Sequence, residues 1–188
     1  MSTLPAVADA LHGIAAAMRV AGARWYLFGA QAAILWGSPR LSADVDVTVQ
    51  LDRDAITNLI DAMHGQGFDL MIGDAEFIER TRVLPFVHRS TRMPVDVVIA
   101  GPGLEEEFLN RAIGVALRDE SIPVISPDDL IITKILAGRP KDIEDVRAVI
   151  RARRDDIDLL RVRSLLRLLE EALGQSDLLP ALDAALRP

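Results

Sequence analysis

Hydrophobic and polar residues alternate along the chain with two different periods, which predicts both helices and strands. Apolar residues fall at helical spacing over residues 4–20, so an amphipathic helix is expected there. Residues 43–51 alternate strictly, with valines at every second position, which is typical of a strand buried on one face. Short apolar runs predict further strands at 25–28, 68–72, 83–88, 93–100 and 115–117. Helices are expected between them at 30–36, 54–64, 74–80 and 104–110.

The last third of the chain predicts helices only. Ser126 followed by Pro127 and two aspartates is a strong helix-start signal, and Gly138 marks the end of that helix. A second helix is expected from Pro140, and a third over about 156–173. The order of elements predicts an α/β (α+β) fold: a mixed sheet flanked by helices, then a helical tail. We expect a core domain at residues 1–125 and a C-terminal helical region at 126–188, packed on that core.

Composition narrows the classes of protein that this pattern allows. The chain has no cysteine, which excludes disulfides, thiolate catalysis and cysteine-based zinc sites. No apolar run approaches the ~18–20 residues that a membrane span needs, so we expect a soluble, cytoplasmic protein. The formal net charge is −7, but residues 134–167 contain ten basic and six acidic residues. That stretch is either an anion-binding wall or an ordinary solvated helical surface.

Three aspartates inside apolar strands are the strongest candidates for chemistry. Asp44 and Asp46 are two residues apart on an expected strand, so both carboxylates point to the same face. Asp96 repeats the pattern on a later apolar strand. Neighbouring carboxylates repel each other, and a divalent cation such as Mg²⁺, which prefers oxygen ligands, would compensate for this repulsion. Three carboxylates suffice for two ions in a phosphoryl transfer; the competing interpretation is a polar, solvent-facing strand.

A turn upstream of these aspartates is a candidate phosphate site. Phe28-Gly29-Ala30 places a glycine between an expected strand and the start of a helix, where backbone N–H groups can receive a phosphate. Ser38, Arg40 and Ser42 follow just before the aspartate pair and add side chains that bind phosphates. A lone strand–glycine–helix turn is usually only a tight turn, so the turn gains weight from its neighbours.

These motifs resemble the nucleotidyltransferase superfamily related to DNA polymerase beta. Its signature is a glycine turn, nine to thirteen further residues, a D-h-[D/E]-h strand and a third acid on a later strand. Phe28-Gly29-Ala30, Asp44-Val45-Asp46-Val47 and Asp96 match this signature. Residues 27–49 are especially similar to the abortive-infection (AbiEii-type) nucleotidyltransferase toxins. The family usually has Gly or Ser where this chain has Ala30, which affects the expected phosphate contact and not the carboxylates.

The resemblance implies a role for each motif residue. Asp44, Asp46 and Asp96 would hold two Mg²⁺ ions, with Mn²⁺ as an alternative, and would be the catalytic residues. Gly29, Ala30, Ser38, Arg40 and Ser42 would contact the nucleotide. In the tail, Lys134 and Lys141 would contact the triphosphate of an NTP, and Asp142 and Asp145 would orient them. Without the resemblance, the residues around Lys134 favour a lysine that extends outward to solvent from an apolar helix.

The resemblance also suggests an activity: transfer of a nucleoside monophosphate from an NTP to an acceptor hydroxyl. The acceptor expected from the relatives is RNA, specifically the 3′ end of tRNA, in a toxin–antitoxin or phage-defence setting with a cognate antitoxin protein. Antibiotic-modifying enzymes share the core, so an aminoglycoside-type acceptor is an alternative. A third hypothesis is a catalytically weak nucleotide-binding or interaction module.

Overall fold

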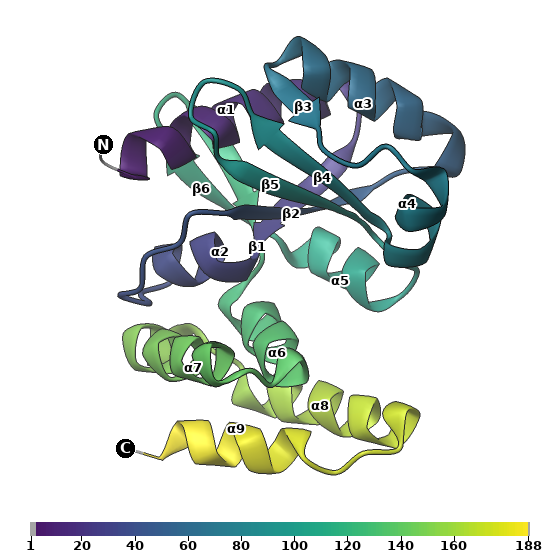
Figure 1. Cartoon of the computed structure of the whole chain (residues 1–188). Helices are drawn as coiled ribbons and strands as arrows, with labels where there is room; N and C mark the ends of the chain where they lie inside the picture. The colour runs from purple at the N-terminus through teal and green to yellow at the C-terminus, as the bar shows by residue number, and fades with distance from the viewer. Residues whose placement is uncertain (1–2, 188) are drawn as a thin grey trace. The chain divides into compact units, whose positions relative to one another are not determined.

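A computed structural model describes residues 3–187 of the chain (Figure 1). Contacts between residues group the chain into two units. Unit 1 contains residues 3–31 and 42–125, and unit 2 contains residues 32–41 and 126–187. The division into domains at 1–125 and 126–188 remains a prediction. The contacts group residues 32–41 with the C-terminal helices.

Unit 1 is built on one mixed sheet, in which the described residues form seven strands in the order β3-β4-β5-β2-β1-β7-β6. The central pairs are β1 with β2, antiparallel, and β2 with β5, parallel. The strands are β1 (Arg24–Phe28), β2 (Val45–Gln50), β3 (Phe68–Leu70), β4 (Val83–His88), β5 (Pro94–Ile99), β6 (Ile113–Leu117) and β7 (Glu120–Val124). The predicted mixed sheet is therefore confirmed.

The core of unit 1 lies mainly on one face of the sheet. Val45, Val47 and Val49 of β2 are fully buried, as are Val95 and Val97 of β5. Helices α1 (Thr3–Ala21) and α3 (Ile56–Gly65) pack against each other above this face, and α5 (Leu104–Arg111) lies on the opposite side (Figure 1). Burial of β-branched side chains at every second position explains why the valine alternation predicts a strand.

The remaining elements of unit 1 are short. A 3-10 turn (Arg53–Ala55) precedes α3, and α4 (Ala75–Thr81) stands between β3 and β4. Helix α2 (Gly29–Leu35) begins in unit 1 and continues into the part of the chain assigned to unit 2. The strand expected at 43–51 starts at Val45, so Asp44 immediately precedes it.

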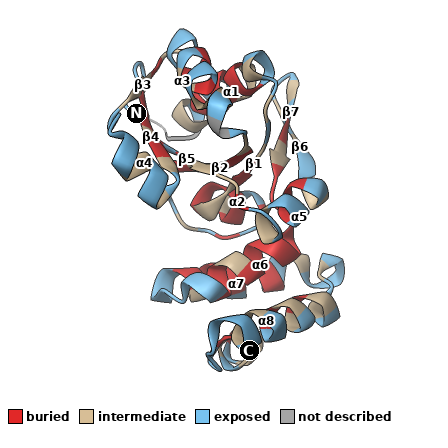
Figure 2. Ribbon diagram, turned by 90° about the vertical axis from the view of Figure 1, so that its right-hand side faces the viewer, coloured by how far each residue is buried: buried red, intermediate tan, exposed pale blue. Residues whose placement is uncertain are grey.

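Unit 2 is helical, and its long helices contain buried residues, which Figure 2 colours red. Ser126 caps the first helix by accepting a hydrogen bond from the backbone N–H of Asp129, as the sequence indicates. The helices are α6 (Pro127–Ala137), α7 (Pro140–Arg153), α8 (Leu159–Leu173) and α9 (Leu178–Leu186), with a 3-10 turn (Arg154–Asp156) before α8. Beyond the last helix expected from the sequence, α9 is a regular helix with three buried residues. Across residues 3–187, no helix is long and apolar enough to cross a membrane.

Candidate active site

Two of the three candidate carboxylates lie side by side on the central strands of unit 1. Asp46 of β2 is directly opposite Asp96 of β5 in a parallel pair. Opposite residues of neighbouring strands project from the same face, with backbones roughly 4.8 Å apart. Asp46 is also opposite Phe28 of β1, the residue before the glycine turn. The sheet register therefore brings Asp46, Asp96 and the turn to one edge.

Asp44 lies in the segment that enters β2, and its side chain is exposed. The hydroxyl of Ser42 donates a hydrogen bond to the Asp44 carboxylate. The backbone carbonyl of Asp44 accepts a hydrogen bond of 3.1 Å from the amide nitrogen of Gln31. Ser42, expected to bind phosphate, is thus held here as a partner of Asp44. Gln31 is a contact that the sequence analysis missed, although it is the single polar residue in α2.

The carboxylates influence each other electrostatically. Desolvation by the surrounding protein raises the pKa of Asp96 above its ordinary value, and the negative charge of Asp44 raises it further. Two carboxylates that repel each other gain free energy when a cation or a proton neutralises one of them. The edge of the sheet that carries Asp96 therefore favours a positive ligand.

The glycine turn leaves space for the Asp46 carboxylate because Gly29 has no side chain. Gly29 has a φ of +67°, in the left-handed region that favours glycine. A Cβ atom placed on Gly29 would lie 2.0 Å from Oδ2 of Asp46, far inside van der Waals contact. Gly29 thus makes room for the Asp46 carboxylate, a role distinct from the phosphate contact expected from the sequence. Ala30 follows as a buried residue in the first turn of α2.

The other predicted site residues form a second cluster inside unit 2. Lys134 donates hydrogen bonds to Asp142 at 2.9 Å and to Asp145 at 2.7 Å. Asp145 also accepts hydrogen bonds from the hydroxyl of Ser38 and from the guanidinium of Arg40, each at 2.8 Å. Lys134 is only 5% exposed, so the lysine does not extend outward to solvent as its neighbours suggested. Helix α6 buries residues on every side, and the two aspartates neutralise the ammonium group within the protein.

The Asp142 carboxylate of this cluster is held in its charged form. Burial alone would raise the pKa of Asp142, but hydrogen bonds from Arg139 and Lys134 and their positive charges outweigh burial and lower it. Asp142 and Asp145 are 0% and 1% exposed, respectively. Buried carboxylates persist only when they are paired and hydrogen-bonded, and here each binds Lys134 and an arginine.

A cleft of about 260 Å³ opens beside this cluster within unit 2. Four predicted nucleotide-binding residues line it: Ser38, Arg40, Lys141 and Asp145. Arg151 also lines the cleft, which the sequence analysis did not indicate. Three basic residues and two acidic ones, Glu144 and Asp145, line the hollow, which leaves one net positive charge toward an anion.

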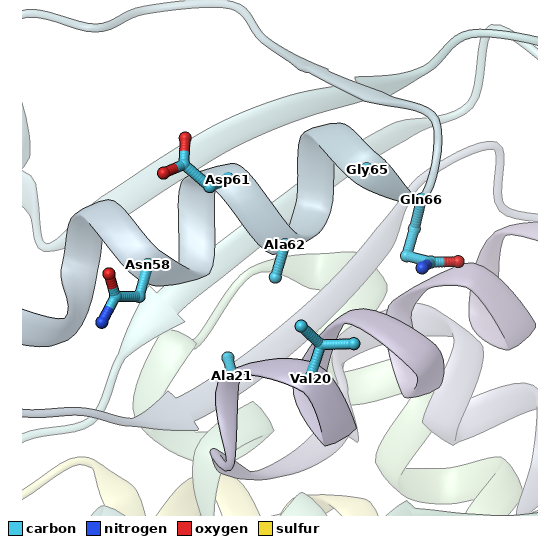
Figure 3. A pocket seen from close by; sticks show the side chains of 7 residues that line it. All are labelled: Val20, Ala21, Asn58, Asp61, Ala62, Gly65 and Gln66. Atoms are coloured by element: carbon cyan, nitrogen blue, oxygen red, sulfur yellow. The ribbon is translucent and has the colours of Figure 1, made fainter.

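Two larger hollows in unit 1 contain none of the predicted site residues. One of about 430 Å³ lies between the C-terminal end of α1, at Val20 and Ala21, and helix α3, whose Asn58, Asp61 and Ala62 line it (Figure 3). The other, of about 580 Å³, is lined mainly by apolar residues beyond the C-terminal ends of β2 and β5. Asp44 precedes β2 and Asp46 is its second residue, so the carboxylates belong to the opposite end of that strand.

The donor set of unit 1 suits a hard divalent cation. Asp44, Asp46 and Asp96 offer only oxygen atoms, the ligands that Mg²⁺ prefers, and their mutual repulsion favours a cation. Within residues 3–187, no three Asp, Glu or His side chains are already arranged as a metal site. The residues fit the metal by chemistry and by register, and their side chains would have to converge further to bind it.

The fold that carries this site is that of the nucleotidyltransferases. The solution structure of the antibiotic-resistance factor ANT(2'')-Ia is similar to this chain with a TM-score of 0.61 at 14% identity, covering 90% of this chain and 96% of that one. Its crystal structure in complex with adenylyl-2"-tobramycin gives a TM-score of 0.62 at 15% identity, covering 89% and 99%. An antigenic nucleotidyltransferase-like protein from Paracoccidioides brasiliensis gives 0.55 at 16% identity, covering 94% and 92%. No curated protein matches the chain.

The chain belongs to the family described as "Nucleotidyltransferase of unknown function (DUF6036)", which it matches over residues 11–170. It is therefore a nucleotidyltransferase, as the aspartate motifs predicted. That match includes the glycine turn, all three carboxylates of unit 1 and the buried cluster of unit 2.

Proposed function

We propose that this protein transfers a nucleoside monophosphate from an NTP to an acceptor hydroxyl in a reaction that depends on Mg²⁺. The observation that carries the proposal is the pairing of Asp46 with Asp96 across β2 and β5, with Asp44 at the entry to β2. Asp44, Asp46 and Asp96 would hold the metal, and Mn²⁺ could replace Mg²⁺. Bound Mg²⁺ would neutralise the negative charge of the phosphoryl group that is transferred.

The protein's own residues position the reactants and move one proton. The acceptor oxygen forms a new bond to the α-phosphorus, the bond to the pyrophosphate oxygen breaks, and pyrophosphate leaves. Asp96 would accept the proton of the acceptor hydroxyl, because it lies directly opposite Asp46 in the sheet and so beside the proposed metal site. Gly29 leaves the space that Asp46 occupies, so the turn keeps this ligand in place. Most of the catalysis would come from orientation and charge neutralisation.

The cleft of unit 2 is our candidate for the nucleotide's phosphates. Arg40, Lys141 and Arg151 line it with Glu144 and Asp145, and the remaining net positive charge attracts a polyanion. Ser38 lines the same cleft, although only 6% of its surface is exposed. Lys134 would act indirectly, since its ammonium already bonds to two carboxylates and holds Asp145 in place. In this proposal Asp142 and Asp145 orient the lysine, as expected from the sequence.

For the acceptor we propose the 3′ hydroxyl of an RNA, with tRNA as the first to be tested. The cationic cleft and the exposed Arg147 and Arg154 of unit 2 support a polyanionic acceptor. The corresponding setting is a toxin–antitoxin or phage-defence pair with a cognate antitoxin. The proposed compartment is the cytoplasm, where NTPs are available.

A small cationic molecule rich in hydroxyl groups is a second candidate acceptor. Unit 1, which holds the carboxylates, has nine basic and sixteen acidic residues in its sequence, a balance of −7, whereas unit 2 has twelve of each. An acidic surface attracts a cation and repels RNA. ANT(2'')-Ia, whose complex contains adenylyl-2"-tobramycin, has a similar fold. Tobramycin is therefore the matching probe.

The test combines the protein with Mg²⁺ and each α-³²P-labelled NTP, and adds either total tRNA or tobramycin. We expect label in one acceptor, release of pyrophosphate, and loss of both in Asp46→Asn. Equal labelling by wild type and Asp46→Asn would show that the carboxylates are not the metal ligands of the reaction. Binding of NTP without any release of pyrophosphate would instead identify a nucleotide-binding module without turnover.

A further inference from the structure

Gln31 is a buried polar side chain in an otherwise apolar helix. It is the third residue of α2, whose sequence is GAQAAIL, and it is 7% exposed. Its amide nitrogen donates two hydrogen bonds of 3.1 Å, one to the backbone carbonyl of Ser42 and one to that of Asp44. An amide nitrogen carries two hydrogens, so both are used on the segment that leads into β2.

The geometry of these bonds determines which end of the amide faces the segment. Both partners are carbonyl oxygens, which accept hydrogen bonds and cannot donate them, so the NH₂ group of Gln31 must point at them. A carboxylate or a thioether in the same place could not make either bond. The two carbonyls bracket Ala43, and Asp44 carries one of the two. Gln31 therefore fixes the backbone at the residue whose side chain is a proposed metal ligand.

The segment is not held there by secondary structure. Residues 42–44 belong neither to α2 nor to β2, so no helix or sheet hydrogen bonds define their path. The Ser42 hydroxyl bonds to the Asp44 carboxylate, which orients the side chain, while Gln31 holds the main chain. Groups that orient a metal ligand contribute substantially to metal affinity.

We infer that Gln31 is a positioning residue for the metal site: its amide holds the Ser42–Asp44 backbone so that the Asp44 carboxylate meets the cation bound by Asp46 and Asp96. This inference rests on the metal-dependent transfer proposed above. It predicts that loss of the two donors weakens metal binding in a folded protein, whereas a purely structural role would lower only its thermal stability.

The test replaces Gln31 by methionine, which has a similar length and no donor, and measures Mn²⁺ binding by electron paramagnetic resonance without nucleotide. We expect the Kd for Mn²⁺ to rise about tenfold or more in Gln31→Met. The Mg²⁺ concentration needed for half-maximal transfer should rise in parallel, with little change in the KM for NTP. Gln50→Met is the matched control. Gln50 is the last residue of β2, the strand that the Ser42–Asp44 segment enters, and its side-chain oxygen accepts a hydrogen bond from Arg24.

The outcomes separate the inference from the function on which it rests. If wild type binds Mn²⁺ and a folded Gln31→Met protein binds it equally well, the inference is wrong and the proposed function stands. If wild type binds no Mn²⁺, the metal site is wrong and the inference fails with it. If Gln31→Met does not fold, Gln31→Asn takes its place; it keeps the amide on a side chain one methylene shorter, and weaker Mn²⁺ binding is again expected.

Discussion

Substitution of Gly29 by alanine tests whether the glycine turn and the carboxylates act as one site. The new Cβ would lie 2.0 Å from Oδ2, 2.8 Å from Cγ and 3.0 Å from Cβ of Asp46. Because real Cβ contacts are essentially never closer than 3.0 Å, the oxygen would have to move by about 1 Å or more. A displacement of ~1 Å at a reacting group can reduce the rate by roughly 10²-fold, or about 2.7 kcal/mol in activation free energy.

The same substitution also has a backbone cost that must be separated from the displacement of Asp46. A non-glycine residue at a φ of +67° loses about 1–2 kcal/mol of folding stability. Gly22→Ala is the matched control, since Gly22 has a φ of +62° and a Cβ added there would meet no atom within 4 Å. We expect both variants to lose similar free energy of unfolding in urea, and only Gly29→Ala to lose transfer activity.

Activity is measured as pyrophosphate release from the NTP with the acceptor that wild type labels, at saturating Mg²⁺. A Gly29→Ala protein with the activity of Gly22→Ala would refute the reasoning, because the Asp46 carboxylate would then tolerate displacement. Loss of activity in both variants would show that backbone strain alone accounts for the effect.

Three further predictions concern the charged groups. Because the pKa of Asp96 is raised in the folded protein, its ionised carboxylate destabilises the metal-free fold above that pKa. Asp96→Asn should therefore raise the Tm at pH 7. This gain in Tm should shrink as the pH falls through the pKa of Asp96 in the folded protein. Lys134→Met removes the ammonium that two buried carboxylates share, and urea unfolding should show a loss of about 3 kcal/mol. The exposed Lys141→Met should change that free energy by less than ~0.5 kcal/mol. Lys141→Met and Arg151→Met should each raise the KM for NTP about two- to fivefold at low salt, and less at high salt. An unchanged KM would show that the cleft does not bind the phosphates of the NTP.

Much of unit 1 could be predicted because its signals are local. The valines at 45, 47 and 49 alternate with polar residues, and a strand buried on one face requires that pattern. The apolar stretch around Asp96 gave its strand in the same way. The register that puts Asp46 opposite Asp96 depends on the order of strands in the sheet, which no local pattern specifies.

The buried cluster shows what local patterns miss. The sequence places Lys134 in an apolar helix, and a lysine there usually extends to solvent. Its actual partners, Asp142 and Asp145, are eight and eleven residues away, across a helix boundary. Ser38 and Arg40 bond to Asp145 across more than a hundred residues of sequence. Such pairings depend on tertiary packing, which the sequence pattern does not specify. They turn Lys134 from an expected phosphate ligand into a partner of two buried carboxylates.

The Gln31 contact could not be predicted for a related reason. A glutamine in a short apolar helix is a signal of a buried hydrogen bond, but the sequence does not identify its acceptors. Those acceptors are backbone carbonyls, which every residue possesses, so no side-chain motif marks them.

The membership of residues 32–41 in unit 2 limits how the protein can be divided into fragments. A cut between residues 125 and 126 would separate Ser38 and Arg40 from Asp145, and Trp36 from Arg153, whose guanidinium lies 5.2 Å from the Trp36 ring. The C-terminal fragment would then keep the buried Asp145 with fewer of its donors, and the N-terminal fragment would carry residues 32–41 without the helices that they pack against. Expression of either piece alone should therefore give poorly folded material, and complementation by mixing the two fragments should restore the fold better than either fragment can.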